Sequence, residues 1–117
     1  MTATVHKQVL INARALIADP AHWTRGTLAS TSDDHQVEWY DHSATKWCAM
    51  GAIYRAANDL VGNPKEATRI SNEVATSVCP LGWLRVSLPT INDARGHAAV
   101  LAVFDKALQA DNNRCES

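Results

Sequence analysis

Hydrophobic side chains recur every three or four positions in four segments of the chain, the spacing of one face of an α-helix. The segments span about residues 4–18, 44–61, 65–78 and 95–110. Asp19-Pro20 ends the first segment, because a residue that precedes proline avoids helical geometry. Asn63 and Pro64 open the third segment as an N-cap and a first helical residue. The pattern predicts a compact bundle of about four helices and a mainly α fold.

Between the first two helices lies a long polar insertion, Pro20 to Ser43, with weak periodicity. Gly26 and the run from Ser30 to Asp34 are typical of turns. Short extended pieces at Thr27-Leu28 and at Val37 to Tyr40 predict a small β-hairpin. A loop of this length in a compact domain usually has a function of its own.

Three further features complete the predicted architecture. The apolar stripe of the second helix is wide, which predicts that other elements contact it on several sides. After the third helix, Leu84, Val86 and Leu88 alternate with polar residues, so a short strand or an extended arm is expected. We expect residues 1–110 to form a single domain and the polar residues 111–117 to be a frayed tail.

Composition excludes several classes of protein. The 117 residues contain 46% hydrophobic residues and carry a net charge of −1, so no basic excess is present to neutralise nucleic-acid phosphates. This balance argues against direct binding of nucleic acid. The start of the chain has no apolar signal segment, and no stretch is long enough to span a membrane. With three cysteines and no CxxC motif, we expect a cytoplasmic protein without disulfides.

Cys48 has two interpretations. It falls in the first or second turn of the predicted second helix, where exposed N–H groups favour a thiolate, so it is a candidate nucleophile. A cysteine-dependent hydrolase or transferase also needs a base and an orienting group, which His97 and Asp93 or Asn92 would supply. The small residues around Cys48 favour the second interpretation, a thiol buried where helices pack closely.

Other polar residues suggest structural roles. His22, His35 and His42 share the insertion with several carboxylates, but their spacing is irregular, so we predict no metal site. His97, on the apolar face of the last helix, is expected to be partly buried and bonded to a neighbouring helix end. Asn92-Asp93 is predicted to be a turn and cap. No nucleotide-binding or metalloprotease motif is present, and no cofactor is predicted.

Four tryptophans are many for a chain of this length. Trp47 and Trp23 are the predicted core residues. Trp39 and Tyr40 lie on the insertion between Glu38 and Asp41, and aromatic residues with a polar rim often dominate protein interfaces. These four residues are the predicted partner-binding surface. The alternative is that Trp39 pins the insertion onto the helices.

Three segments resemble a family of small uncharacterised bacterial and phage proteins classed as a domain of unknown function. They are the Trp-containing turn after the first helix, the WCAxGA helix, and an Asn-Asp turn before a VLxxFDxA helix. The matching residues are Trp23, Trp47, Cys48, Ala49, Gly51, Ala52, Asn92, Asp93, Val100, Leu101, Phe104, Asp105 and Ala107. The resemblance implies a compact domain, assigns no activity, and suggests a phage or mobile-element context.

These observations favour a protein that binds a protein partner, as an accessory or inhibitor, over an enzyme. The identity of the partner and the oligomeric state stay open. The first alternative is the cysteine-dependent enzyme that uses Cys48. A further alternative is a helical domain that binds a small molecule between its second and last helices.

Overall fold

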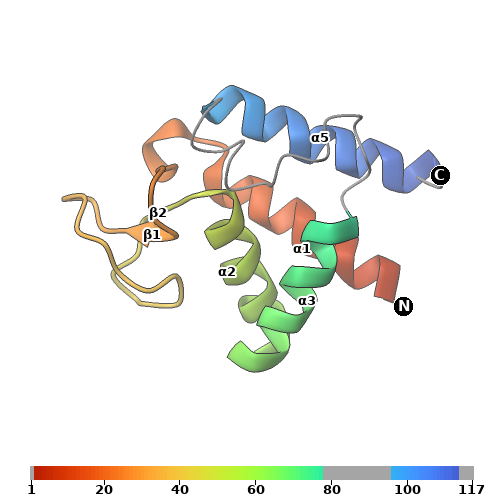
Figure 1. The fold of residues 1–117 in the computed structure, drawn as a ribbon, viewed down its shortest axis with the longest axis horizontal. Helices are drawn as coiled ribbons and strands as arrows, with labels where there is room; N and C mark the ends of the chain where they lie inside the picture. Colours follow the sequence, from red (N-terminus) through yellow and green to blue (C-terminus); the bar gives the residue numbers. More distant parts are fainter. Residues whose placement is uncertain (1, 78–95, 114–117) are drawn as a thin grey trace.

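The computed structural model describes residues 2–77 and 96–113, and four α-helices dominate this part of the chain. The helices are α1 (Thr2–Ile17), α2 (Ala49–Val61), α3 (Pro64–Ser77) and α5 (His97–Asn113), as Figure 1 shows. Between α1 and α2 the chain forms the 3-10 helix η1 (Pro20–His22) and the short strands β1 (Ala29–Ser30) and β2 (Lys46–Trp47). The predicted mainly α fold is confirmed.

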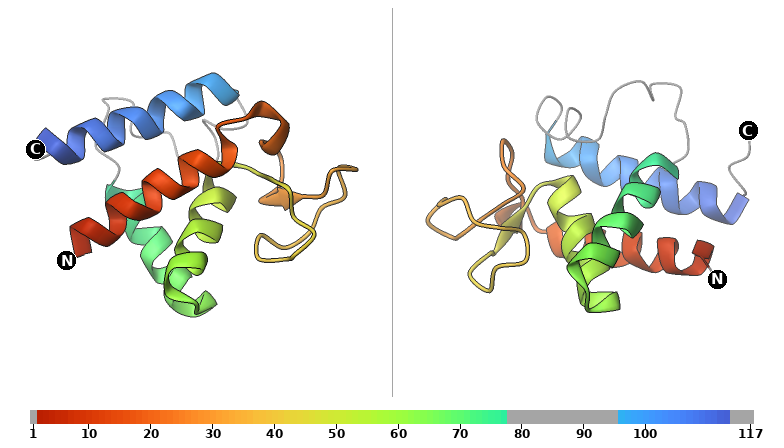
Figure 2. Two further views of the ribbon diagram at one scale, coloured as in Figure 1. Left: turned by 180° about the vertical axis from the view of Figure 1, so that it is seen from behind. Right: turned by 60° about the horizontal axis from the view of Figure 1, so that its bottom comes forward.

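Helix α1 lies between α5 on one side and the α2–α3 pair on the other (Figures 1 and 2). Val9, Ala13 and Ile17 are completely buried and follow one another at intervals of four residues, so one face of α1 meets α2 and α3. Phe104 of α5 and Ile53 of α2 are also fully buried. The core therefore runs through all these helices, and the insertion lies at one end of the molecule.

The second helix begins later than the sequence suggests. Residues 44–48 were predicted to be helical, but Lys46 and Trp47 form β2, which pairs antiparallel with β1. Cys48 is extended and acts as the N-cap of α2, since its Sγ accepts a hydrogen bond from the Gly51 N–H at 3.3 Å. The strand pairing holds this stretch extended and delays the first helical turn.

The insertion packs closely on α2 at Gly51. A Cβ at this position would lie 1.9 Å from the Leu28 carbonyl oxygen, so only glycine allows the approach. The same oxygen accepts a hydrogen bond from the Cys48 N–H at 3.2 Å. As its wide stripe predicts, α2 is therefore contacted on several sides, by α1, α3, β2 and Leu28.

The small sheet is present, but the predicted hairpin strands are wrong. In the observed register Ala29 pairs with Trp47 and Ser30 with Lys46. The segment near Val37 lies on the other side of β1, where the Val37 N–H donates to the Ala29 carbonyl at 3.1 Å. A local antiparallel bridge joins Ser30 and Gln36, close to the predicted hairpin but at other residues. Long-range pairing with β2 on the opposite side of β1 is the part that alternation does not indicate.

Helix ends agree better with their sequence signals. The Asn63 side chain accepts hydrogen bonds from the N–H groups of Lys65 and Glu66 at 2.9 and 3.0 Å, so the predicted N-cap of α3 is confirmed. Helix α5 continues to Asn113, past the predicted end near residue 110 and into the predicted tail. The strand or arm predicted at Leu84 to Leu88 falls outside the described residues.

Candidate partner-binding site

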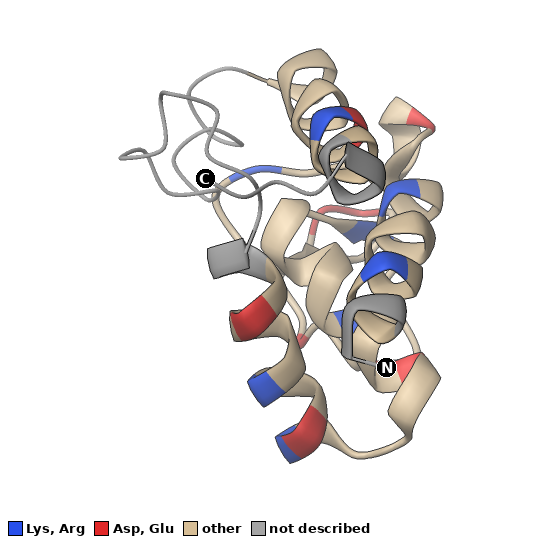
Figure 3. Cartoon of the chain, turned by 90° about the vertical axis from the view of Figure 1, so that its right-hand side faces the viewer, with Lys and Arg blue, Asp and Glu red and all other residues tan. Residues whose placement is uncertain are grey.

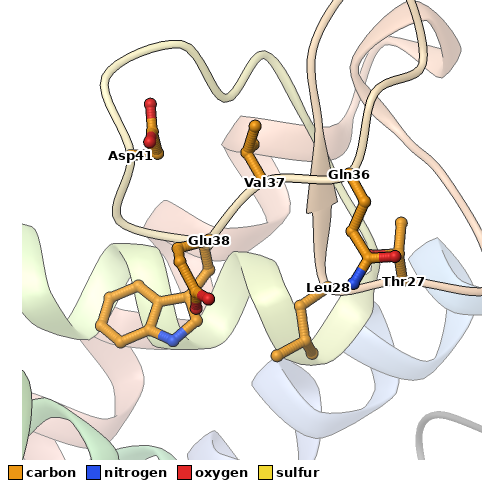
Figure 4. A pocket seen from close by; sticks show the side chains of 7 residues that line it. Thr27, Leu28, Gln36, Val37, Glu38 and Asp41 are labelled. Atoms are coloured by element: carbon orange, nitrogen blue, oxygen red, sulfur yellow. The ribbon is translucent and has the colours of Figure 1, made fainter.

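The insertion encloses an open pocket of about 610 Å³. The pocket is lined by Thr27, Leu28, Gln36, Val37, Glu38, Trp39 and Asp41. Figure 4 shows that two segments form it, one leading into β1 and one following the turn after β1, with Gln36 directed toward Thr27 and Leu28. Its volume falls within the usual range of about 300–1,000 Å³ for ligand pockets. The lining combines apolar side chains with two carboxylates.

Two consecutive turns shape the wall of the pocket. The Asp41 N–H donates to the Glu38 carbonyl at 3.0 Å, and the Ala44 N–H donates to the Asp41 carbonyl at 3.1 Å. The Asp41 carboxylate accepts hydrogen bonds from the Ser43 hydroxyl at 2.7 Å and from the Ser43 N–H at 2.8 Å. These bonds, the hydroxyl first, lower the pKa of Asp41 below its ordinary value of 3.8. Asp41 therefore stays negatively charged at neutral pH.

Trp39 anchors this wall to the helices. Its side chain is only 8% exposed and stacks on Tyr54 of α2, with ring centroids 5.5 Å apart. Its carbonyl accepts hydrogen bonds from Trp47 Nε1 and from an Arg55 Nη1 nitrogen, both at 3.2 Å. Trp39 thus pins the insertion, the second of the two roles considered for it.

Tyr40, the next residue, has the opposite environment. Its side chain is 51% exposed and meets the Trp39 ring edge-on, with centroids 5.0 Å apart. Glu38 and Asp41 on either side of this aromatic pair are also exposed. Of the four predicted binding residues, Glu38, Tyr40 and Asp41 therefore face solvent, and we call these three residues the acidic face.

Carboxylates of the insertion and of the helices differ in their partners. The helical carboxylates with described contacts all pair with cations: Asp59 with Arg55, Glu66 and Glu73 with Arg69, and Asp105 with Arg14. Figure 3 shows the two signs alternating along α3, the helix that leads into a grey segment. In the insertion Asp34 pairs with Lys46, but within the described residues the carboxylates of Asp33, Glu38 and Asp41 contact no lysine or arginine.

This difference produces an uneven charge distribution. Residues 24–43 contain four carboxylates and a single arginine, so with neutral histidines they carry a net charge of −3. Since the whole chain carries −1, its other residues carry +2. The negative charge is concentrated at the end of the molecule where the pocket lies.

Of the alternative catalytic set, the structure describes Cys48 and His97. Cys48 is 5% exposed, and it lies before the first turn of α2, not within it as predicted. His97 Nε2 lies 2.6 Å from the carbonyl oxygen of Ile17, the last residue of α1. The prediction of a partly buried histidine bonded to a helix end is thereby confirmed. Asn92 and Asp93 fall outside the described residues.

The remaining candidates are also placed. Trp47 is buried, as predicted, whereas Trp23 is only partly buried and contacts His97 with the two rings tilted by 56° and their centroids 5.6 Å apart. Within residues 2–77 and 96–113, no three histidine, cysteine or acidic side chains are grouped so that they could hold a metal ion. Among the same residues, no helix has both the length and the apolar character needed to cross a membrane.

Four pocket residues were not identified from the sequence: Thr27, Leu28, Gln36 and Val37. The sequence predicts that Thr27-Leu28 and Val37 to Tyr40 lie next to each other, and all of these residues except Tyr40 line the same pocket. The sequence therefore indicates that the two segments are neighbours, but it does not indicate that they enclose a pocket. Leu28 is a further sequence signal, because it is a large apolar residue within a mainly polar insertion, and the structure leaves it 38% exposed.

The fold and the site together define a small, mainly α-helical domain with an acidic pocket built from an insertion. The chain belongs to the Family of unknown function (DUF6197), whose model matches residues 1–110. The expected membership in a domain family of unknown function is thereby confirmed. Neither a curated protein nor a solved structure matches the chain.

Proposed function

We propose that this protein acts by binding a protein partner through the acidic face, as a small accessory or inhibitor protein of the cytoplasm. The observation that carries the proposal is the environment of Tyr40. This large aromatic side chain is half exposed on a turn that hydrogen bonds fix, between carboxylates that no lysine or arginine neutralises in the described part of the chain. The resemblance to phage proteins supports a host protein as the partner.

Three physical effects favour binding at this place. Tyrosine in a polar rim is among the residues that contribute most to interface affinity. A turn already held by Trp39, Arg55 and Ser43 loses little conformational entropy when it binds. The net charge of −3 on residues 24–43 attracts a basic surface and raises the association rate.

The test compares two exposed apolar side chains of similar accessibility. Tyr40 is 51% exposed on the acidic face, and Ile11 is 42% exposed on α1. The wild-type protein captures its partner from a lysate of the source cells, and the purified partner is then titrated with Tyr40→Ala and Ile11→Ala variants. We expect Tyr40→Ala to weaken binding at least about tenfold, the loss typical of a hot spot, while Ile11→Ala binds normally.

The outcome that contradicts the proposal is equally specific. If Tyr40→Ala binds the partner as tightly as the wild type, the acidic face is not the binding surface. Trp39→Ala is unsuitable for this test, because the side chain is buried and its loss would disturb the fold of the insertion.

A further inference from the structure

We propose that the pocket receives an arginine side chain, carried by an extended segment of the partner protein. This inference rests on the proposed function and names the chemistry that its binding site recognises. Three observations support it: the lining of the pocket, the carboxylates without a cationic partner there, and the position of Arg55, which contacts the same wall.

The lining matches both parts of an arginine side chain. Leu28, Val37 and Trp39 supply apolar surface, against which the methylene stem of an arginine packs favourably. Glu38 and Asp41 line the same pocket and supply carboxylates for the guanidinium. Hydrogen bonds between a guanidinium and a carboxylate are about twice as strong as those between neutral groups.

The carboxylates are available for an external cation. The Asp41 carboxylate receives its hydrogen bonds from Ser43, a neutral residue. Within the described residues, the Glu38 carboxylate takes part in no hydrogen bond or ion pair. In contrast, Lys46 already pairs with Asp34 at 2.6 Å. A basic side chain that enters the pocket therefore displaces no ion pair of the described residues.

Arg55, a cation of this chain close to the pocket, contacts backbone carbonyls of the pocket wall and not its carboxylates. Its guanidinium donates to the carbonyls of Trp39 and Asp41 at 3.2 and 3.4 Å, and it pairs with the Asp59 carboxylate at 3.4 Å. Arg55 thus supports the wall from the side of α2 through backbone oxygens. The side-chain carboxylates that line the pocket are left for a ligand.

Arginine fits this site better than lysine does. A guanidinium is planar, offers five donors in a fixed arrangement and stacks on aromatic rings, whereas an ammonium is a compact, strongly hydrated point charge. The pocket presents a tryptophan beside two carboxylates from one turn, which suits the planar group. Its volume of about 610 Å³ leaves room for the neighbouring residues of an extended segment.

The test uses short glycine–serine peptides that carry two arginines, two lysines or two citrullines. Citrulline keeps the shape of arginine without its charge. Binding to the full chain is followed by NMR, through the Trp39 indole and the backbone amides of residues 36–41. We expect saturable shifts with the arginine peptide, binding about tenfold weaker with lysine, and no binding with citrulline.

Matched variants locate the effect. Glu38→Gln and Asp41→Asn are each expected to weaken the arginine peptide about tenfold, because each removes one charge from the pocket. Asp33→Asn removes an exposed, unpaired charge of the same insertion outside the pocket lining and should leave the affinity unchanged. Equal loss in all three variants would show general attraction only and would overturn the assigned site.

The two proposals fail in different ways. If Tyr40→Ala abolishes partner binding but the arginine peptide causes no saturable shift, or the lysine peptide binds equally well, the arginine assignment is wrong and the proposed function stands. If Tyr40→Ala leaves partner binding intact, the proposed function is wrong whatever the peptides do.

Discussion

The helical body and the insertion use the same residue types in opposite ways. On the described parts of the helices, carboxylates meet cations, as in the pair formed by Arg14 Nε and Asp105 Oδ1 at 2.6 Å. On the insertion, Glu38 and Asp41 contribute two carboxylates to the pocket, and neither carboxylate contacts a lysine or arginine among the described residues. The described helical carboxylates are paired with cations, whereas the insertion keeps two carboxylates available for a ligand.

The adjacent aromatic residues Trp39 and Tyr40 show the same contrast between the body and the insertion. Trp39 is buried and stacks on Tyr54 of α2, so its burial contributes to the stability of the helical core. Tyr40 is half exposed and belongs to the surface. The chain thus anchors the insertion with one aromatic ring and exposes the next.

The largest effect on stability is expected from Trp39. Trp39→Ala removes the anchor of the insertion and should lower the free energy of unfolding by about 3 to 4 kcal/mol, as loss of a buried large aromatic does. Chemical denaturation followed by circular dichroism measures the change. Tyr40→Ala is the matched control and should cost less than about 1 kcal/mol. Equal losses in the two variants would contradict the contrast between anchor and surface.

A smaller loss is expected at the junction of the two regions. Gly51→Ala places a Cβ against the Leu28 carbonyl, a backbone atom that cannot move aside freely, and should cost about 2 to 3 kcal/mol. Thermal unfolding measures it. Gly26→Ala separates the clash from backbone strain: Gly26 has a φ of 81° with no atom near its absent Cβ, so we expect about 1 kcal/mol. A stable Gly51→Ala variant would show that the insertion is not seated on α2.

Charge removal tests the electrostatic contrast directly. Asp105→Asn breaks an exposed ion pair of the body and should cost about 0.5 kcal/mol. Glu38→Gln removes an unpaired charge and should leave stability unchanged within the error of a denaturant titration. If Glu38→Gln destabilises the protein as much as Asp105→Asn does, then Glu38 has a structural partner and is not reserved for a ligand.

The smallest effect concerns pH. The hydrogen bonds from Ser43 lower the pKa of Asp41 in the folded state. These bonds therefore stabilise the fold fully at pH values above the ordinary pKa of 3.8, and the stabilisation is lost as the pH falls through the lower pKa of the folded state. Asp41→Asn keeps an oxygen that can accept the same bonds but cannot titrate. Its melting temperature should therefore fall less steeply in acid than that of the wild type. Parallel acid profiles for the two proteins would contradict the assigned cause.

The sequence predicts structure well where the stabilising contacts are local, and poorly where they join residues far apart in the chain. Local signals were sufficient for the cap at Asn63, and periodicity predicted the helices and the bond of His97 to a helix end. The strand at Lys46 and Trp47 was missed, because its partner β1 lies sixteen or more residues earlier and no local pattern records that pairing.

The candidate site shows the same limit. Exposure of Glu38, Tyr40 and Asp41 followed from their polar setting, but burial of Trp39 depends on its stacking partner Tyr54, which lies on another element. The small residues around Cys48, Gly51 among them, indicated close packing of helices, but the atom that requires the glycine is the Leu28 carbonyl, which lies far away in the sequence. Sequence reasoning found the segment, and tertiary contacts decide which of its residues anchor and which face solvent.

The most direct test of this account is hydrogen–deuterium exchange on the full chain, free and bound to its captured partner. We predict that binding protects the amides of residues 27–30 and 36–44 and leaves exchange on α1 and α5 unchanged. Protection confined to the helices, with the insertion exchanging as in the free protein, would contradict the claim that the insertion is the binding surface.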